Sequence, residues 1–228
     1  MKYPVNLIIF DFDGVIINSG QDIASAAQHV LKLFDQPVLS QEEIISYVGH
    51  GVQYLIKNCF KGCDDDFVEQ VIPVYRKHYL KNAVVKTRLY EHVEETLEYI
   101  KKSGENNKIA LVTNKPEDLT YKILEVLGVK PYFDMVVGPE SVKKMKPDPE
   151  GILQVLEQFK IPPQQAIMVG DSHVDVEAGK NAGIATCGVT YGLGDREELI
   201  NSSPDILIND LGELLEHIEN IPAGSPKY

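Results

Sequence analysis

Residues 5–15 decide the fold, and they read Val-Asn-Leu-Ile-Ile-Phe-Asp-Phe-Asp-Gly-Val. The apolar run at 5–10 has the composition of a buried strand, and two aspartates and a glycine follow it at once. Five further short β-rich runs lie at residues 108–113, 134–137, 166–170, 184–189 and 205–208. Segments with helical periodicity separate them, which is typical of a parallel sheet with helical crossovers. The sequence therefore predicts an α/β fold with a doubly wound parallel sheet.

Residues 11–107 separate the first two predicted strands, which is far more than one crossover needs. Residues 16–83 show no good strand pattern, but apolar residues recur every three or four positions at 23–34 and 67–78. We therefore expect residues 16–83 to form an inserted all-helical cap domain, with 1–15 and 84–228 as a Rossmann-like core. The crossings near 16–19 and 84–88 are candidate hinges. The tail at 221–228 is expected to fray.

Composition excludes several classes of protein. The 228 residues include 22 Lys+Arg and 34 Asp+Glu, a net charge of −12 that disfavours nucleic-acid binding. The apolar run at 5–10 is far shorter than the roughly 20 residues of a membrane span, and too short for a signal-peptide core. We therefore expect a cytoplasmic protein that binds no membrane, as a monomer or a homodimer. The spacing of Cys59, Cys63 and Cys187 indicates neither a disulfide framework nor a zinc site.

Polar side chains gather where the predicted strands end. They are Asp11, Asp13, Thr113, Asn114, Asp171 and Asp175. The carboxyl ends of parallel strands meet at one edge of a sheet, so we expect these side chains to converge. The four carboxylates would repel one another unless a cation joined them. Oxygen ligands without His or Cys favour Mg²⁺, and Lys146 supplies a second positive charge.

Taken alone, an aspartate after a strand is usually a turn or capping residue. The combination is more specific: residues 11–15 read Asp-Phe-Asp-Gly-Val, 112–114 Val-Thr-Asn, 146–149 Lys-Pro-Asp-Pro, and 169–175 Val-Gly-Asp-Ser-His-Val-Asp. As a set, these segments resemble the four motifs of the haloacid dehalogenase superfamily, in its phosphatase branch with a helical cap inserted after the first motif. The resemblance covers nearly the whole chain. Val15 departs from it, because phosphatases of this family often carry Thr there, whereas the phosphomutase branch tolerates Val.

The charge and proton movements of phosphoryl transfer, together with the resemblance, indicate roles for Asp11 and Asp13. Phosphoryl transfer needs an in-line nucleophile, neutralised equatorial oxygens and a proton for the leaving oxygen. Asp11 is the candidate nucleophile, which would form an aspartyl-phosphate. Asp13 is the candidate general acid and then the base for the hydrolytic water. Dehalogenases and phosphonate-cleaving relatives lack the second aspartate, so their chemistry is disfavoured.

The resemblance also implies the remaining ligands. Mg²⁺ would be held by the Asp11 side chain, the Asp13 backbone carbonyl and Asp171. Thr113 and the Asn114 amide would bind the phosphoryl oxygens.

Three further residues complete the expected core site. Lys146 would spread charge from both the nucleophile and the phosphate. Asp175 would either be a further metal ligand through water or orient Lys146. Gly14 would let the backbone curl around the phosphate.

The predicted cap carries a glycine-flanked turn at residues 47–52, Tyr-Val-Gly-His-Gly-Val. It resembles the substrate-specificity loop of phosphoglycolate-type phosphatases, with Gly49 and His50 as candidate substrate contacts, although a plain helix–loop–helix turn explains the glycines equally well. Ser19 and Asn18 lie where the first motif meets the cap and are candidates to sense the leaving group. Cationic side chains that would meet a substrate carboxylate, or else face solvent, are Lys57, Arg76 and Lys77.

These features predict a Mg²⁺-dependent phosphomonoester hydrolase that acts on a small phosphorylated metabolite, with phosphoglycolate-type acids as the leading class. A phosphosugar mutase resembling β-phosphoglucomutase uses the same aspartate pair, and sugar phosphates, nucleotides and pyrophosphate are alternative substrates. A non-enzymatic phospho-receiver module also gathers aspartates, a Thr and a Lys at strand ends, but it lacks a helical insert and takes these residues from different strands.

Overall fold

The computed structural model describes residues 2–104 and 107–220, so the predicted frayed tail lies outside the described residues. Its central sheet has six strands in the order β6-β5-β2-β7-β8-β9, and every neighbouring pair is parallel. In chain order this is 3-2-1-4-5-6, the doubly wound arrangement that the sequence predicts. The strands are β2 (Leu7–Phe10), β5 (Lys108–Val112), β6 (Met135–Val137), β7 (Ala166–Gly170), β8 (Ala185–Val189) and β9 (Ile206–Ile208).

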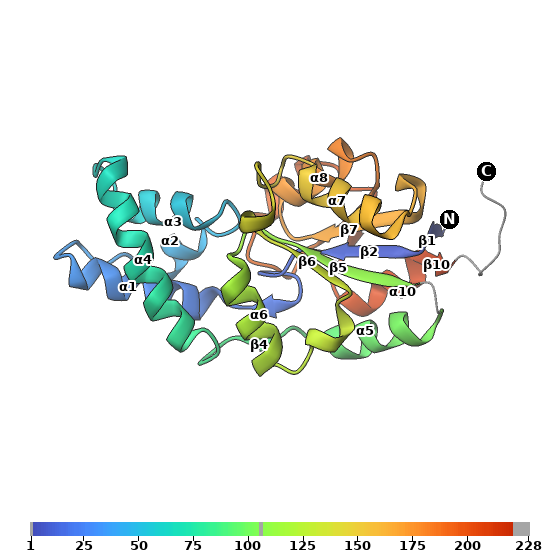
Figure 1. The fold of residues 1–228 in the computed structure, drawn as a ribbon, viewed down its shortest axis with the longest axis horizontal. Helices are drawn as coiled ribbons and strands as arrows, with labels where there is room; N and C mark the ends of the chain where they lie inside the picture. The colour runs from blue at the N-terminus through green and yellow to red at the C-terminus, as the bar shows by residue number, and fades with distance from the viewer. Residues whose placement is uncertain (1, 105–106, 221–228) are drawn as a thin grey trace.

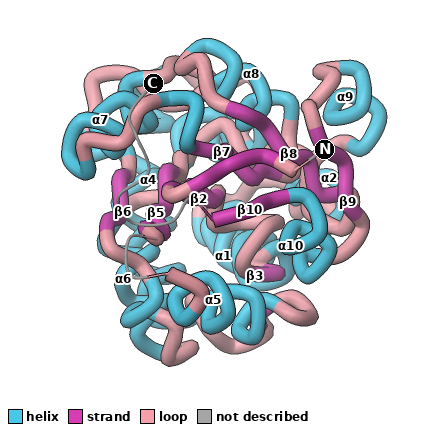
Figure 2. Tube along the Cα trace, turned by 90° about the vertical axis from the view of Figure 1, so that its right-hand side faces the viewer, coloured by secondary structure: helices cyan, strands magenta, loops and turns pink. Residues whose placement is uncertain are grey.

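Helices cover both faces of this sheet (Figures 1 and 2). One face carries α5 (Val93–Lys102) and α6 (Glu117–Val126), and the other carries α7 (Glu150–Phe159) and α8 (His173–Asn181). The alternation of β2 explains the two layers: Ile8 and Phe10 belong to the core that includes α5 and α6, whereas Leu7 and Ile9 belong to the core of α7 and α8. A strand buried on both faces reads as a continuous apolar run, as this one does.

Short elements complete the core domain. The three-residue strands β1 (Tyr3–Val5) and β10 (Ile218–Asn220) form a separate parallel pair. The remaining elements of the core are α9 (Arg196–Asn201), α10 (Leu214–His217) and the 3₁₀ helices η1 (Lys130–Tyr132), η2 (Pro139–Ser141), η3 (Pro163–Gln165) and η4 (Leu211–Glu213).

Four helices form the cap at one end of the molecule (Figure 1). They are α1 (Gly20–Leu33), α2 (Gln41–Ile45), α3 (Val52–Cys59) and α4 (Asp65–Asn82). All four lie within the predicted insert at 16–83. Two begin at side-chain caps, because Ser40 accepts a hydrogen bond from the Glu43 N–H and Asp64 accepts one from the Phe67 N–H.

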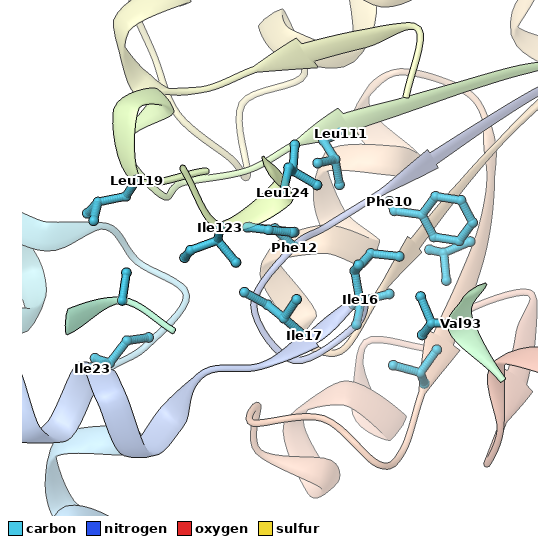
Figure 3. Close-up of a cluster of buried hydrophobic side chains, with 14 of the residues drawn as sticks. Phe10, Phe12, Ile16, Ile17, Ile23, Val93, Leu111, Leu119, Ile123 and Leu124 are labelled. Carbon is cyan, nitrogen blue, oxygen red and sulfur yellow. The ribbon is translucent and has the colours of Figure 1, made fainter. Parts of the chain in front are cut away.

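The two crossings between core and cap lie side by side. Strand β3 (Ile17–Asn18) leads into the cap and pairs antiparallel with β4 (Arg88–Leu89), which leads out of it. Apolar side chains continue from the sheet through this junction: Figure 3 shows Phe12, Ile16 and Ile17 between Phe10 of β2 and Ile23 of α1.

Asp22 fixes the same junction from the cap side. This buried carboxylate of α1 accepts hydrogen bonds from the backbone N–H groups of Val85, Lys86 and Thr87 at 2.8–3.1 Å, and from the Thr87 hydroxyl at 2.8 Å. The start of α1 is therefore bound directly to the segment that returns to the core. Over residues 2–104 and 107–220, no helix is both long and apolar enough to cross a bilayer.

Candidate active site

The predicted site residues come together because β2 lies between β5 and β7. Asp11 follows β2, Thr113 follows β5 and Asp171 follows β7. Lys146 reaches them from the loop before α7. The site therefore lies at the switch point of the sheet, where the strand order reverses and open α/β folds bind ligands.

Three buried carboxylates form the centre of the site. Oxygen atoms of Asp11, Asp171 and Asp175 all lie within 4.8 Å of one another. Lys146 is the cation among them, with its Nζ 2.9 Å from Asp11 Oδ1 and 2.7 Å from Asp175 Oδ1. When all three carboxylates are ionised, their negative charge exceeds the single positive charge of Lys146 by two, and a divalent cation would balance that excess.

The site fits Mg²⁺ in its chemistry as well as its charge. Asp11 Oδ1 is buried, and despite the nearby Lys146 it accepts no well-aligned hydrogen bond from the described residues. Burial, together with the neighbouring carboxylates, raises the pKa of Asp11 to about 6 against the opposing charge of Lys146, and raises the pKa of Asp171 to about 8. Carboxylate oxygens short of a partner and reluctant to ionise are those that a hard cation stabilises.

Asp171 is held by its surroundings with little freedom to move. Its Oδ2 accepts hydrogen bonds from the backbone N–H groups of Leu193 at 2.7 Å and Gly194 at 2.9 Å. A Cβ at Gly14 or Gly192 would collide with the Asp171 carboxylate. Gly14 has φ +85°, so it serves both a turn and this close approach. Position 14 therefore requires a glycine because the Asp171 carboxylate lies so close, as well as for the approach of any phosphate.

Asp175 has its hydrogen-bonding capacity largely filled by protein groups. Oδ2 accepts from the Ser172 N–H at 3.1 Å and the Ser172 hydroxyl at 2.7 Å in a capping box at the start of α8, while Oδ1 binds Lys146. Of the two roles left open by the sequence, orientation of Lys146 is the one with a direct contact.

Asp13 lies beside Asp11 in a separate network. The Ser19 hydroxyl donates to its Oδ1, and Lys115 Nζ lies 3.0 Å and 3.1 Å from its two carboxylate oxygens. Lys115 also donates to the Tyr79 hydroxyl of α4 at 2.8 Å. The sequence reasoning missed Lys115, although its position directly after Thr113 and Asn114 at a strand end was the available signal.

The Asn114 side chain joins two loops. Its Nδ2 donates to the Gly49 carbonyl of the cap at 2.8 Å and to the Lys146 carbonyl at 3.1 Å, and its Oδ1 accepts from the Lys146 N–H at 3.1 Å. These bonds occupy the side chain, so a phosphoryl contact from Asn114 is left to its backbone N–H. Thr113 Oγ1 accepts from the Lys115 N–H at 3.2 Å and keeps its own proton to donate.

A cavity of about 50 Å³ separates core and cap. It accommodates on the order of four water-sized groups. Its main polar lining residues from the core are Asp11, Asp13, Thr113, Asn114 and Lys115. The cap contributes Ile23, Tyr47, Val48, Gly49, Gly51, Val52, Leu55, Tyr75 and Tyr79.

Several predicted substrate contacts lie elsewhere. Gly49 lines the cavity, but Gly14, Ser19 and His50 do not. Ser19 instead donates its hydroxyl to Asp13. The His50 ring instead lies 4.6 Å from the Tyr54 ring and 5.7 Å from the His173 ring, measured between centroids.

The three cap cations also lie outside the cavity lining. Lys57 pairs with Asp65 at 2.7 Å within the cap. Arg76 of α4 reaches across to the core, where it pairs with Asp118 at 2.8 Å and Glu140 at 3.1 Å. Arg76 is thus a bridge between the domains rather than a lining residue.

Comparison with known proteins agrees with this geometry. Residues 8–189 match the family described as haloacid dehalogenase-like hydrolase. The chain is 37% identical to a phosphoglycolate phosphatase of Aquifex aeolicus (strain VF5), over 95% of this chain and 98% of that protein. It is 34% identical to a candidate pyrophosphatase of Clostridium perfringens (strain 13 / Type A), over 95% and 99%.

Solved structures show the same architecture. The crystal structure of a predicted phosphoglycolate phosphatase from Haemophilus somnus 129pt superposes with a TM-score of 0.87 at 30% identity, covering 93% of this chain and 97% of that one. The family match spans most of the chain, including the strands β2, β5 and β7 that carry the acidic site. The chain belongs to the haloacid dehalogenase-like hydrolase family.

Proposed function

We propose that this protein is a Mg²⁺-dependent phosphomonoesterase that works through an aspartyl-phosphate on a small phosphorylated acid of the phosphoglycolate type. The observation that carries this proposal is the buried group of Asp11, Asp171, Asp175 and Lys146 beside a small cavity that the cap encloses. The name of the Aquifex aeolicus relative supports the same substrate class.

Each core residue then has a task. Asp11 attacks phosphorus, and Asp13 gives a proton to the leaving oxygen and later takes one from the hydrolytic water. The Asp11 side chain, the Asp13 carbonyl and Asp171 would hold Mg²⁺, with Asp175 as a further ligand through water, and the ion would supply charge neutralisation to the phosphoryl oxygens. Thr113 donates its hydroxyl to a phosphoryl oxygen.

Positive charge and position complete the chemistry. Lys146 offsets negative charge on Asp11 and on the transferred group. Asp175 keeps Lys146 in place. Ser19 fixes the rotamer of Asp13, and Gly49 brings the cap turn onto the core through Asn114. The His50 ring lies against Tyr54 of the cap and His173 of the core, outside the cavity lining.

The relatives favour a short leaving group, because the Aquifex aeolicus protein is named a phosphoglycolate phosphatase and phosphoglycolate releases a two-carbon acid. Pyrophosphate is the second candidate, because it is equally compact and because of the name of the Clostridium perfringens relative. A phosphosugar mutase is the alternative reaction, and it differs in returning the phosphoryl group to a sugar. We place the reaction in the cytoplasm, with the small metabolite as its partner.

Two measurements test the proposal. The first is kcat/KM for phosphoglycolate, pyrophosphate, sugar phosphates and nucleotides, with sugar isomers assayed as well as free phosphate. Phosphoglycolate should rank first, and a place near the bottom would remove the substrate class. The second is Asp11→Asn, which should lower turnover by roughly 10³-fold or more and abolish trapping of an acid-stable phosphoenzyme. Substantial residual turnover would take the nucleophile role away from Asp11.

The matched control for that variant is Asp66→Asn. Asp66 is an exposed aspartate in the first turn of α4, and its replacement should leave turnover unchanged. Circular dichroism of both variants checks that the fold is retained.

A further inference from the structure

The charges around the cavity are unevenly divided. Every cap residue that lines it is uncharged, and the core contributes the carboxylates Asp11 and Asp13. Among the described residues that line the cavity, Lys115 is the one cation. A substrate whose leaving group carries a negative charge would meet two like charges there; Lys146 pairs with Asp11 from outside the cavity lining, and Lys115 is the cation that faces the cavity beside Asp13.

Lys115 lies where such a group would be. Its side chain is 3% exposed, and its ammonium lies between Asp13 of the core and the Tyr79 hydroxyl of the cap. The ammonium is also 4.6 Å from the centroid of the Tyr79 ring. It therefore faces the junction of core and cap, where the part of the substrate beyond the phosphoryl group must be held.

The contact between Lys115 and Asp13 indicates which part of the substrate lies next to Lys115. In the proposed function, Asp13 serves the leaving oxygen. A group attached to the carbon next to that oxygen is therefore adjacent to Lys115 Nζ, which lies 3.0 Å from Asp13 Oδ1. An acid phosphorylated at its α position carries its carboxylate at this place.

We propose that Lys115 is a specificity-determining residue that binds the carboxylate of an α-phosphorylated acid. This inference rests on the proposed function and names the group that selects its substrate. The carboxylate accepts a hydrogen bond from the Lys115 ammonium, while the surrounding tyrosine rings and aliphatic side chains exclude water and strengthen that contact. The cap thus shapes the cavity, and Lys115 of the core supplies the charge that distinguishes acidic substrates from neutral ones.

A different role for Lys115 would be to hold Asp13 in position and nothing more. The two roles differ in what they predict for a neutral substrate. A residue that only positions Asp13 affects all substrates with the same leaving oxygen alike, whereas a residue that binds the carboxylate affects only those that carry one.

The experiment compares phosphoglycolate with its neutral amide, phosphoglycolamide, on Lys115→Met and the wild type. The wild type should favour the carboxylate by about 10- to 100-fold in kcat/KM, the range of one charge-assisted hydrogen bond. Lys115→Met should bring that preference close to one. The matched control is Lys122→Met, an exposed lysine of α6, which should keep the wild-type preference.

A binding measurement covers the case in which Lys115→Met has too little turnover to assay. Both compounds are titrated calorimetrically against Asp11→Asn and against Asp11→Asn with Lys115→Met, since neither protein needs to turn over. The second replacement should weaken phosphoglycolate by about 10- to 100-fold and leave phosphoglycolamide nearly unchanged. Equal weakening of the two ligands, or no weakening of either, would overturn the proposal.

The two proposals fail in different ways. If the wild type ignores phosphoglycolate but prefers 2-phospholactate to its amide, and Lys115→Met loses that preference, the substrate proposal fails and the Lys115 proposal stands. If phosphoglycolate is a good substrate and Lys115→Met keeps the wild-type preference, the Lys115 proposal fails and the enzyme proposal stands.

Discussion

Replacing Asp22 by Asn should strongly destabilise the protein, because this buried carboxylate accepts hydrogen bonds from the segment that returns to the core. Asp22 Oδ2 accepts from three backbone N–H groups and from the Thr87 hydroxyl. The side chain is almost completely buried. An asparagine keeps one acceptor oxygen without its charge and adds an NH₂ group that faces backbone donors.

The size of the effect follows from the number of donors. A hydrogen bond to a charged group is worth about 1 kcal/mol more than a neutral one, so four donors correspond to about 4 kcal/mol. Bonds that share one oxygen do not add fully, and we expect a loss of about 3 kcal/mol. That is a large part of the roughly 5–15 kcal/mol by which a typical protein is stable.

Urea unfolding followed by circular dichroism measures this loss as a change in the free energy of unfolding. Glu69→Gln, at an exposed position of α4, removes the same charge without buried partners and should change stability by less than about 0.5 kcal/mol. A loss below about 1 kcal/mol in Asp22→Asn would refute the view that this carboxylate holds the junction of cap and core.

Three further outcomes are expected. Burial raises the pKa values of Asp11 and Asp171 above those of the unfolded chain, so metal-free protein should lose stability as pH rises from about 4 to 8. The gain in Tm on adding Mg²⁺ should therefore be larger at pH 8 than at pH 5. Equal gains at the two pH values would contradict this reasoning. Arg76→Gln should raise KM up to about fivefold in low salt, because its two exposed ion pairs contribute about 1 kcal/mol in total to cap closure. In 0.5 M NaCl the variant and the wild type should have the same KM. The control variant Lys57→Gln should keep the wild-type KM at both salt concentrations. Asp13→Asn should slow phosphoglycolate hydrolysis by roughly 10²- to 10⁴-fold and p-nitrophenyl phosphate hydrolysis much less, whereas equal losses would argue against an acid role.

The sequence predicted the elements that local pattern determines. All six strands of the central sheet are present, with ends that differ from the prediction by at most two residues. The convergence of Asp11 and Asp171 was predicted for the same reason, because a buried parallel strand is an apolar run and its carboxyl end marks one edge of the sheet.

Features that depend on contacts between residues far apart in the sequence were not predicted. Strands β1 and β10 are three residues each and come from opposite ends of the chain, so neither has a pattern of its own. Lys115 owes its place to Asp13 on another strand and to Tyr79 on a cap helix. Arg76 fits a solvent-facing helical position, and only the docked core shows what it binds. Side-chain partners across two domains leave no periodic signal in one sequence.

The pairing of β3 with β4 restricts how the cap can travel. Two unpaired connecting segments would let the cap slide, twist and lift over the core. Because β3 and β4 are paired at Ile17↔Leu89 and Asn18↔Arg88, they bend together as one neck between the domains. A neck of this kind leaves mainly a tilting movement over the sheet edge. Stiffening that neck is therefore expected to slow substrate entry and product release without altering any group that touches phosphorus.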